Sequence, residues 1–237
     1  MNEKNFDIYL EFNYLKLNLA AFNKLNGKLE FYKEKSYKLY FEDNNKLNFD
    51  ELQKFVEESI LELEKSIDYF VKDIYLMIET PQSTSIKLSV VKNNEGKKLI
   101  KEDAKYLIQD AKQLFLKSNK DSSIIHIIVE NYVLDNINYN FFPIDRNCNK
   151  FSIDIKFICL PKILIKNFEK LFSKQQIYVN KFICSNYVKR FEFKNNNKNL
   201  CERGRDIIEG INKQEVVSIP KTIKKTGFFE KLFHLFR

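Results

Sequence analysis

Segments with strand-like and helix-like periodicity alternate along this chain from its N-terminal region to about Val188. Apolar residues recur at helical spacing from Phe49 to about Lys65, and the next stretch, "DIYLMIE", has the composition of a buried strand that ends before Pro81. Alternation of this kind predicts helices packed on sheets, so the fold class we expect is mixed α/β.

The N-terminal segment "FDIYLEFNYLKLNLAAFN" is rich in apolar and aromatic residues that roughly alternate. It is followed by Asn26-Gly27, a pair that favours a tight turn, and then by "KLEFYKEKSYKLYF". We therefore expect an N-terminal β-hairpin whose turn lies at Asn26 and Gly27.

A second block begins near Gln82 with the strand-like sequence "STSIKLSVVKN". A helix is predicted over "IKEDAKYLIQDAKQLFLKS", because its apolar residues form one stripe and Glu102 and Asp103 suit the first turn of a helix. The later elements that we predict are two strands, a helix and a closing strand, over "SSIIHIIVENYVLDN", "KFSIDIKFICLP", "KILIKNFEKLFSKQ" and "IYVNKFICSNYV".

Beyond Val188 the periodicity weakens and basic residues gain over acidic ones. Residues 189–237 hold 12 Lys and Arg against 6 Asp and Glu, whereas the preceding part holds 28 against 26. This composition predicts a flexible basic linker, with at most a short helix near Arg205 to Ile211.

The terminal sequence "TGFFEKLFHLFR" segregates completely on a helical wheel. Its apolar residues fall within about 160° of arc, with a basic approach upstream, as is typical of a helix that lies in the headgroup region of a membrane. The predicted membrane-binding residues are Phe228, Phe229, Leu232, Phe233, Leu235 and Phe236 on the apolar face, with Lys221, Lys224, Lys225, Lys231 and Arg237 meeting anionic headgroups.

Two other uses of this peptide are open. It could dock on its own domain or in the groove of a partner protein. The sequence pI of about 9.1 also allows nucleic-acid binding, although nucleic acid would leave the apolar face uncovered, and we expect no nucleic-acid partner. No run of apolar residues is long enough to span a bilayer, and no signal peptide precedes the first strand, so we expect a cytosolic protein that binds the membrane peripherally.

Catalytic and metal-binding patterns are not found in the sequence. Cys148, Cys159, Cys184 and Cys201 form no CxxC pair, which indicates reduced structural thiols and no metal site. His126 lies in an apolar run, where a hydrogen-bonded sheet histidine is more common than a catalytic base. We expect no enzymatic activity.

The middle of the chain resembles the inserted 1C (SHS2-like) domain of the FtsA family, actin-like membrane tethers of bacterial cell division. The matching stretches are "LIKEDAKYLIQDAKQLF", "IIHIIVENYVLDN" and "FPIDRNCNKFSIDIKFICLPKILIKNFEKLF". Ile125, His126, Asp135 and Pro143 stand where the family pattern places them, and Val129 replaces a usual proline. A C-terminal amphipathic helix after a linker is a second feature of that family.

The resemblance fails at the nucleotide site. The family's first hairpin carries a phosphate motif close to D-x-G-[TS], and here the corresponding stretch is "LEFNYLK". Glu11 stands for the Asp, Asn13 replaces the Gly and Tyr14 the hydroxyl residue, so we expect the bulky tyrosine to occupy the phosphate space and no cofactor to bind. The second actin-like half, which also carries the FtsZ-docking surface, has no counterpart, so direct FtsZ binding is not expected.

The resemblance implies a reduced adaptor. The division we expect is a degenerate actin-like subdomain 1A over 1–80, a 1C-like interaction domain over 81–176, a return strand to 1A over 177–193, a flexible basic linker over 194–225 and a membrane-targeting helix over 226–237. Such a protein would recruit or organise division proteins through 1C, with self-association as a further use, at the division site on the cytoplasmic face of the bacterial inner membrane. The alternatives are an adaptor of type IV pilus assembly similar to PilM, and a degenerate relic with no partner.

Overall fold

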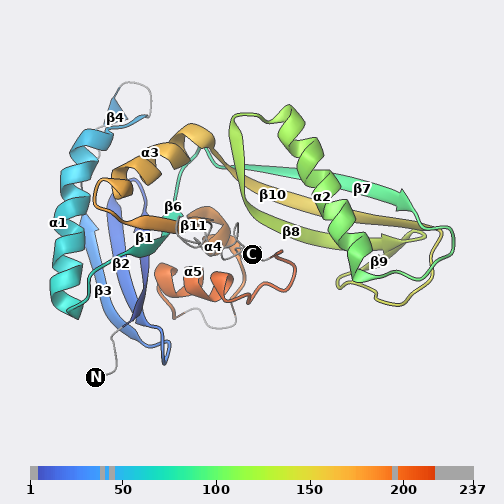
Figure 1. Ribbon diagram of the computed structural model, residues 1–237, viewed down its shortest axis with the longest axis horizontal. Helices are drawn as coiled ribbons and strands as arrows, with labels where there is room; N and C mark the ends of the chain where they lie inside the picture. The colour runs from blue at the N-terminus through green and yellow to red at the C-terminus, as the bar shows by residue number, and fades with distance from the viewer. Residues whose placement is uncertain (1–4, 38–40, 43–45, 194–196, 217–237) are drawn as a thin grey trace, which may run out of the picture.

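The structure, a computed structural model, describes residues 5–37, 41–42, 46–193 and 197–216 (Figure 1). Its strands are β1 (Phe6–Phe12), β2 (Lys16–Asn23), β3 (Leu29–Ser36), β4 (Phe41–Glu42), β5 (Lys46–Leu47), β6 (Asp73–Ile78), β7 (Thr84–Asn93), β8 (Ser122–Leu134), β9 (Ile137–Tyr139), β10 (Lys150–Pro161) and β11 (Tyr178–Cys184). Its helices are α1 (Phe49–Ile67), α2 (Lys101–Ser118), α3 (Lys162–Ser173), α4 (Ser185–Arg190) and α5 (Leu200–Ile208). The mixed α/β class is confirmed.

The first sheet has the strand order β11-β6-β1-β2-β3. Strands β1, β2 and β3 form an antiparallel meander, whereas β6 pairs in parallel with β1 and β11 pairs in parallel with β6. All elements from β7 to α3 therefore lie, in sequence, within the crossover that joins β6 to β11.

The predicted turn at Asn26 and Gly27 is confirmed between β2 and β3, but a second turn, which the sequence did not indicate, precedes it. The segment read as a single strand forms β1 and β2, which pair from Phe6 opposite Asn23 to Phe12 opposite Leu17, and Gly27 lies in the next turn, between β2 and β3. Nearly every residue of β1 and β2 is buried because both faces of this sheet are covered, so the run from Phe6 to Asn23 shows no strong polar break.

Helices of the same chain cover both faces of the first sheet. On one face α1 and α3 pack against apolar residues of the strands in one continuous cluster. On the other face α4 and α5 pack over Tyr9, Phe22 and Met77, where they close a second cluster. At Gly204 of α5 a Cβ would lie only 2.5 Å from Met77 Sδ, so the glycine permits the close approach of this helix to the sheet.

The second sheet is antiparallel with the order β7-β10-β8-β9, and α2 lies across one face (Figure 1). The predicted apolar stripe of α2 is confirmed at Ala104, Leu107, Ala111 and Phe115, which are buried in the cluster between helix and sheet. Helix α3, which we assigned to the 1C-like domain, packs against the first sheet instead, so the second unit ends near Pro161 rather than at residue 176.

The region after β11 is more ordered than the sequence suggested. The predicted closing strand ends at Cys184, and Ser185–Arg190 form α4. Within the expected linker, α5 begins with a capping box between Asn199 and Glu202 and buries Cys201, Gly204 and Ile207 on the first sheet. The expectation of a flexible linker is therefore wrong for residues 197–216, because this short helix has its own apolar face.

Candidate functional site

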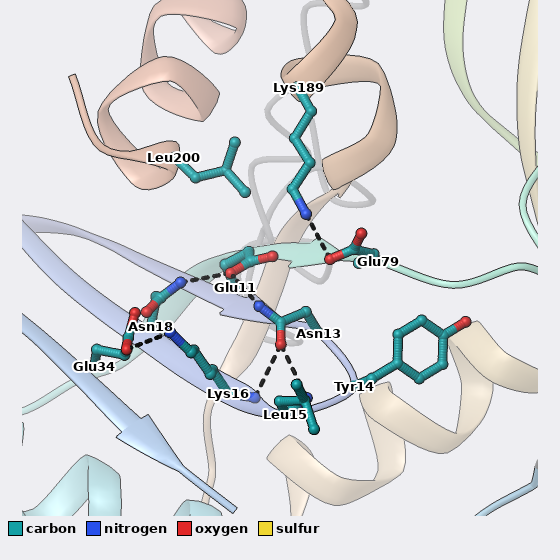
Figure 2. A pocket seen from close by; sticks show the side chains of 10 residues that line it. All are labelled: Glu11, Asn13, Tyr14, Leu15, Lys16, Asn18, Glu34, Glu79, Lys189 and Leu200. Atoms are coloured by element: carbon teal, nitrogen blue, oxygen red, sulfur yellow. Dashed lines mark hydrogen bonds and ion pairs between the residues drawn. The ribbon is translucent and has the colours of Figure 1, made fainter. Parts of the chain in front are cut away.

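A pocket of about 360 Å³ lies at the turn between β1 and β2, where the family resemblance places the phosphate motif (Figure 2). Its walls come from the turn itself, from β2 and β3, from the end of β6 and from α4 and α5. The lining residues are Glu11, Asn13, Tyr14, Leu15, Lys16, Asn18, Glu34, Glu79, Lys189 and Leu200.

The turn at the mouth of this pocket uses its own backbone donors internally. Asn13 Oδ1 accepts hydrogen bonds from the backbone N–H groups of Leu15 at 3.0 Å and Lys16 at 2.9 Å. The N–H of Asn13 in turn donates to the Lys16 carbonyl at 3.0 Å. A phosphate-binding loop requires N–H groups that point at the ligand, and these three point into the turn.

The floor of the pocket is acidic. Glu11 is fully buried and accepts a hydrogen bond from Asn18 Nδ2 at 2.6 Å; burial raises the pKa of its carboxyl, although the bond from Asn18 opposes this. The two lysines are each ion-paired, Lys16 with Glu34 and Lys189 with Glu79, both at 2.6 Å. Two ion pairs and one further carboxyl group therefore line the pocket, so it has no net positive charge, which disfavours a polyanion.

Tyr14 does not fill the phosphate space as we expected. Figure 2 shows its ring pointing away from Glu11, Asn18 and Lys189, and 37% of its surface is exposed. Because the Asn13 side chain closes the turn, Tyr14 is free to point outward over the rim of the pocket.

The predicted membrane-binding residues all lie outside the described residues. They are Lys221, Lys224, Lys225, Phe228, Phe229, Lys231, Leu232, Phe233, Leu235, Phe236 and Arg237. Among the residues that the structure describes, no helix is both long enough and apolar enough to cross a membrane. The membrane peptide stays a prediction from the sequence.

His126 is a satisfied buried histidine, as the sequence suggested. Its Nε2 accepts the N–H of Cys184 at 3.0 Å, so the ring proton sits on Nδ1 and is donated to Glu215 Oε1 at 2.7 Å. Burial lowers the pKa of His126, although Glu215 acts in the opposite direction. Burial alone would raise the pKa of Glu215, but hydrogen bonds from His126 and Tyr187 and the charge of Lys181 lower it.

This histidine belongs to a network that joins the two sheets to the C-terminal segment. Tyr187 of α4 donates to Glu215 Oε2 at 2.9 Å and accepts from Asn212 Nδ2 at 2.6 Å. Residues 214–216 also extend the second sheet, because the N–H of Val129 donates to the Gln214 carbonyl at 2.9 Å and that of Val216 to the Ile127 carbonyl at 2.8 Å. We call residues 212–216 the docking segment.

Sequence reasoning missed the docking segment. Glu215 is 89 positions from His126 and stands in a polar stretch without periodicity, so no local signal pairs them. A usable hint was that "EVV" resumes strand-like composition at residues 215–217.

The cysteines are free thiols and all four are buried, which agrees with a structural role. Burial raises the pKa of Cys159 to about 12, so this thiol is not activated as a nucleophile. Within the described residues, no group of three His, Cys, Asp or Glu side chains is placed to hold a metal ion.

Comparisons with known proteins give similarity only at the level of solved structures. No family model and no curated protein matches the chain. A PilM-PilN type IV pilus biogenesis complex matches with a TM-score of 0.48 and 6% identity, covering 77% of this chain and 48% of that chain. A protein from Bacteroides thetaiotaomicron, described as having an actin-like ATPase fold and unknown function, matches with a TM-score of 0.36 and 14% identity, covering 78% and 54%.

The cytoplasmic domain of EpsL, an inner membrane component of the type II secretion system of Vibrio cholerae, matches with a TM-score of 0.36 and 8% identity, covering 80% of this chain and 59% of that chain. This chain thus spans about half the length of the structures it matches. At these identities and scores, no activity or partner is carried over from them.

Proposed function

We propose that this protein is a non-enzymatic adaptor with a reduced actin-like body, held peripherally at the cytoplasmic face of the membrane by its C-terminal peptide. The closed turn between β1 and β2 is the main support for the absence of nucleotide binding. The Asn13 side chain accepts hydrogen bonds from the N–H groups of Leu15 and Lys16, which a bound phosphate would need, and Glu11 and Glu79 line the same pocket.

The topology of the first sheet supports the actin-like part of the proposal. An antiparallel meander, β1 to β3, is followed by two parallel strands, β6 and β11, and a separate α/β unit is inserted between those two strands. This is the arrangement that a subdomain 1A interrupted by an inserted interaction domain would have. Helix α5 covers the sheet face opposite α1 and α3, so the body needs no second half to bury that surface.

The tether rests on the terminal sequence. Residues 226–237 segregate apolar from basic side chains, and burying several phenylalanines in the headgroup region contributes several kcal/mol, with about 1 kcal/mol for each nearby lysine. The docking segment holds Val216 against the second sheet, so the start of the segment that connects the body to the predicted helix has a fixed position.

The pathway that this adaptor serves has two candidates. The sequence resemblance favours an FtsA-like role, in which the second sheet and α2 recruit or organise division proteins. A PilM-like role in pilus assembly is the alternative. A fluorescent fusion in the native cell distinguishes them: a band at the division site supports the first, and its absence from that site throughout the cell cycle contradicts it.

Co-sedimentation with anionic liposomes tests the tether. We compare the full chain with residues 1–216, which keep the docking segment, and with Phe229→Asp/Phe233→Asp. The full chain should pellet even at high salt, and the truncated chain and the double variant should stay in solution, because apolar burial resists salt whereas phosphate contacts alone do not.

The matched control is Ser218→Asp/Thr222→Asp, which adds the same charge between the docking segment and the predicted helix. Its retention on the liposomes, together with release of the phenylalanine variant, supports the apolar face as the anchor. Pelleting of Phe229→Asp/Phe233→Asp would refute the tether.

Equilibrium dialysis with labelled ATP and Mg²⁺ tests the loss of nucleotide chemistry. We expect no retention at ligand concentrations up to the millimolar range, because Asn13 occupies the N–H groups of Leu15 and Lys16 and both lysines that line the pocket are ion-paired. Saturable retention that is lost in Glu11→Lys would contradict the proposal.

A further inference from the structure

The position of Val216 restricts which part of the body can lie near a membrane. The N–H of Val216 donates to the Ile127 carbonyl, so Val216 lies at the outer edge of β8 in the second sheet. Nine residues, 217–225, separate this point from the predicted membrane helix. At about 3.3 Å per residue they reach at most about 30 Å, so the part of the body beside this edge stays close to the bilayer.

Helix α2 presents one of its flanks toward this edge. The other flank faces β7, because Asp103 pairs with Lys92 of that strand. In the second sheet β10 lies between β7 and β8. The flank of α2 opposite Asp103 therefore faces β8 and the docking segment at its outer edge. Ile108 of this flank and Val216 are both half-buried against the same apolar cluster.

This flank carries lysines and apolar side chains. At about 100° per residue, its members fall within about 80° of arc, beside the buried stripe of α2. Glu102, Asp103 and Asp110, the acidic residues of α2, fall outside this arc. We call the five residues Lys101, Lys105, Ile108, Lys112 and Leu116 the lysine flank.

The side chains of the lysine flank are accessible. Lys101 and Lys105 are exposed, Lys112 is half-buried, and Leu116 keeps 43% of its surface exposed. Lys105 contacts Glu102 at 3.4 Å, but both side chains are about 70% exposed, and such surface pairs contribute little. The flank therefore offers positive charge beside an exposed apolar side chain.

We propose that the lysine flank of α2 is a second lipid-binding surface, which contacts anionic headgroups and holds the tethered body in one orientation on the bilayer. The proposal rests on the proposed function, since the tail must first bring the body to the membrane. Two observations favour a lipid surface as the occupant: the position of Val216, which packs against the same apolar cluster as Ile108 of the flank, and the charge of the flank, which is opposite to that of anionic headgroups.

Vesicle titration of the full chain tests this proposal. We measure the dissociation constant on vesicles containing 30% phosphatidylglycerol for the wild type, for Lys101→Glu/Lys105→Glu/Lys112→Glu, and for the control Lys54→Glu/Lys166→Glu/Lys170→Glu. The control reverses three lysines of α1 and α3, which pack on the other sheet, so its change in net charge is identical.

Binding should weaken about tenfold or more in the α2 variant relative to the control, because three lysines near an anionic surface each contribute appreciably. Equal binding by the two variants overturns the lysine flank and leaves the tether standing. A wild type that fails to bind overturns both. The same relative loss on neutral phosphatidylcholine vesicles also overturns the proposal, because headgroup charge would then be irrelevant.

A second measurement leaves every lysine in place. Because the four native thiols are buried, Leu116→Cys can be labelled selectively with an environment-sensitive fluorophore, as can the control Leu61→Cys on the exposed face of α1. Anionic vesicles should shift the emission of the label at position 116 to the blue and leave that at position 61 unchanged. A label at position 116 that stays in an aqueous environment refutes the proposed orientation.

Discussion

Removal of the Glu215 carboxylate should strongly destabilise the body, although the sequence around Glu215 looks like a linker. Glu215→Ala leaves two donors without this acceptor: the buried Nδ1–H of His126, 2.7 Å from the carboxylate, and the half-buried O–H of Tyr187, 2.9 Å from it. A hydrogen bond to a charged group is worth about 1.5–3 kcal/mol, so the expected loss is about 3–6 kcal/mol. If residues 212–216 detached in the variant, water would reach the two donors, and the loss in free energy of unfolding would be nearer about 3 kcal/mol.

Urea unfolding of residues 1–216, followed by circular dichroism, measures this loss. The matched control is Glu209→Ala, which removes a carboxylate from the same region whose side chain is 54% exposed and pairs with Arg205. The control should change the free energy of unfolding by less than about 1 kcal/mol. A loss below about 1 kcal/mol for Glu215→Ala as well would show that the network does not hold the docking segment, and our account of the C-terminal region would be wrong.

Three further perturbations test the packing and the electrostatics. Burial lowers the folded-state pKa of His126 below its ordinary 6.5, so the unfolded chain binds the proton more readily and the free energy of unfolding should fall as pH drops below about 6.5. In urea unfolding, His126→Gln should reduce this dependence of stability on pH, and an unchanged dependence would contradict the explanation. Burial raises the pKa of Glu11, so its ionised form is disfavoured in the folded state. Glu11→Gln should therefore raise the melting temperature at pH 7.5 but not at pH 4, and a lower melting temperature at pH 7.5 would contradict this explanation. Gly204→Ala should lower the free energy of unfolding by about 1–3 kcal/mol, because its added Cβ would lie too close to Met77 Sδ. Adding Met77→Ala to this variant should cost less than the sum of the two single changes, and additive effects would argue against the close approach of α5 to the sheet.

The sequence predicted the elements whose periodicity is strong and whose two faces differ. Helix α1 buries Leu52, Val56 and Ile60 on one side and exposes its polar side, so its helical spacing could be recognised in the sequence. Helix α2 could be predicted for the same reason. Strands β7, β8 and β10 of the second sheet were also predicted within a few residues of their observed ends, whereas the three-residue strand β9 was not predicted.

Two features were predicted incompletely, for different physical reasons. Six of the seven residues of β1 and six of the eight of β2 are buried, so no strong polar break marked the turn after Phe12, which contains no glycine. Helix α5 was expected only as a short helix near Arg205 to Ile211, whereas it begins at Leu200. Its buried face consists of Cys201, Gly204 and Ile207, which are too few to stand out from polar neighbours.

The candidate site was predicted in part. The family resemblance placed a degenerate phosphate motif at Glu11, Asn13 and Tyr14, but only the structure shows that the Asn13 side chain closes a turn there and that Tyr14 points outward. The His126–Glu215 contact could not have been predicted, because a pair 89 positions apart with no shared motif is determined by the tertiary fold alone.

The cover that α5 places on the first sheet has a consequence for synthesis of the protein. Tyr9 and Phe22 leave the ribosome well before Cys201 and Ile207, which close over them and follow about 200 residues later. At about 5–20 residues per second, this aromatic surface stays uncovered for about 10–40 s in each nascent chain. The nascent protein should therefore be a client of chaperones that bind apolar segments until α5 emerges.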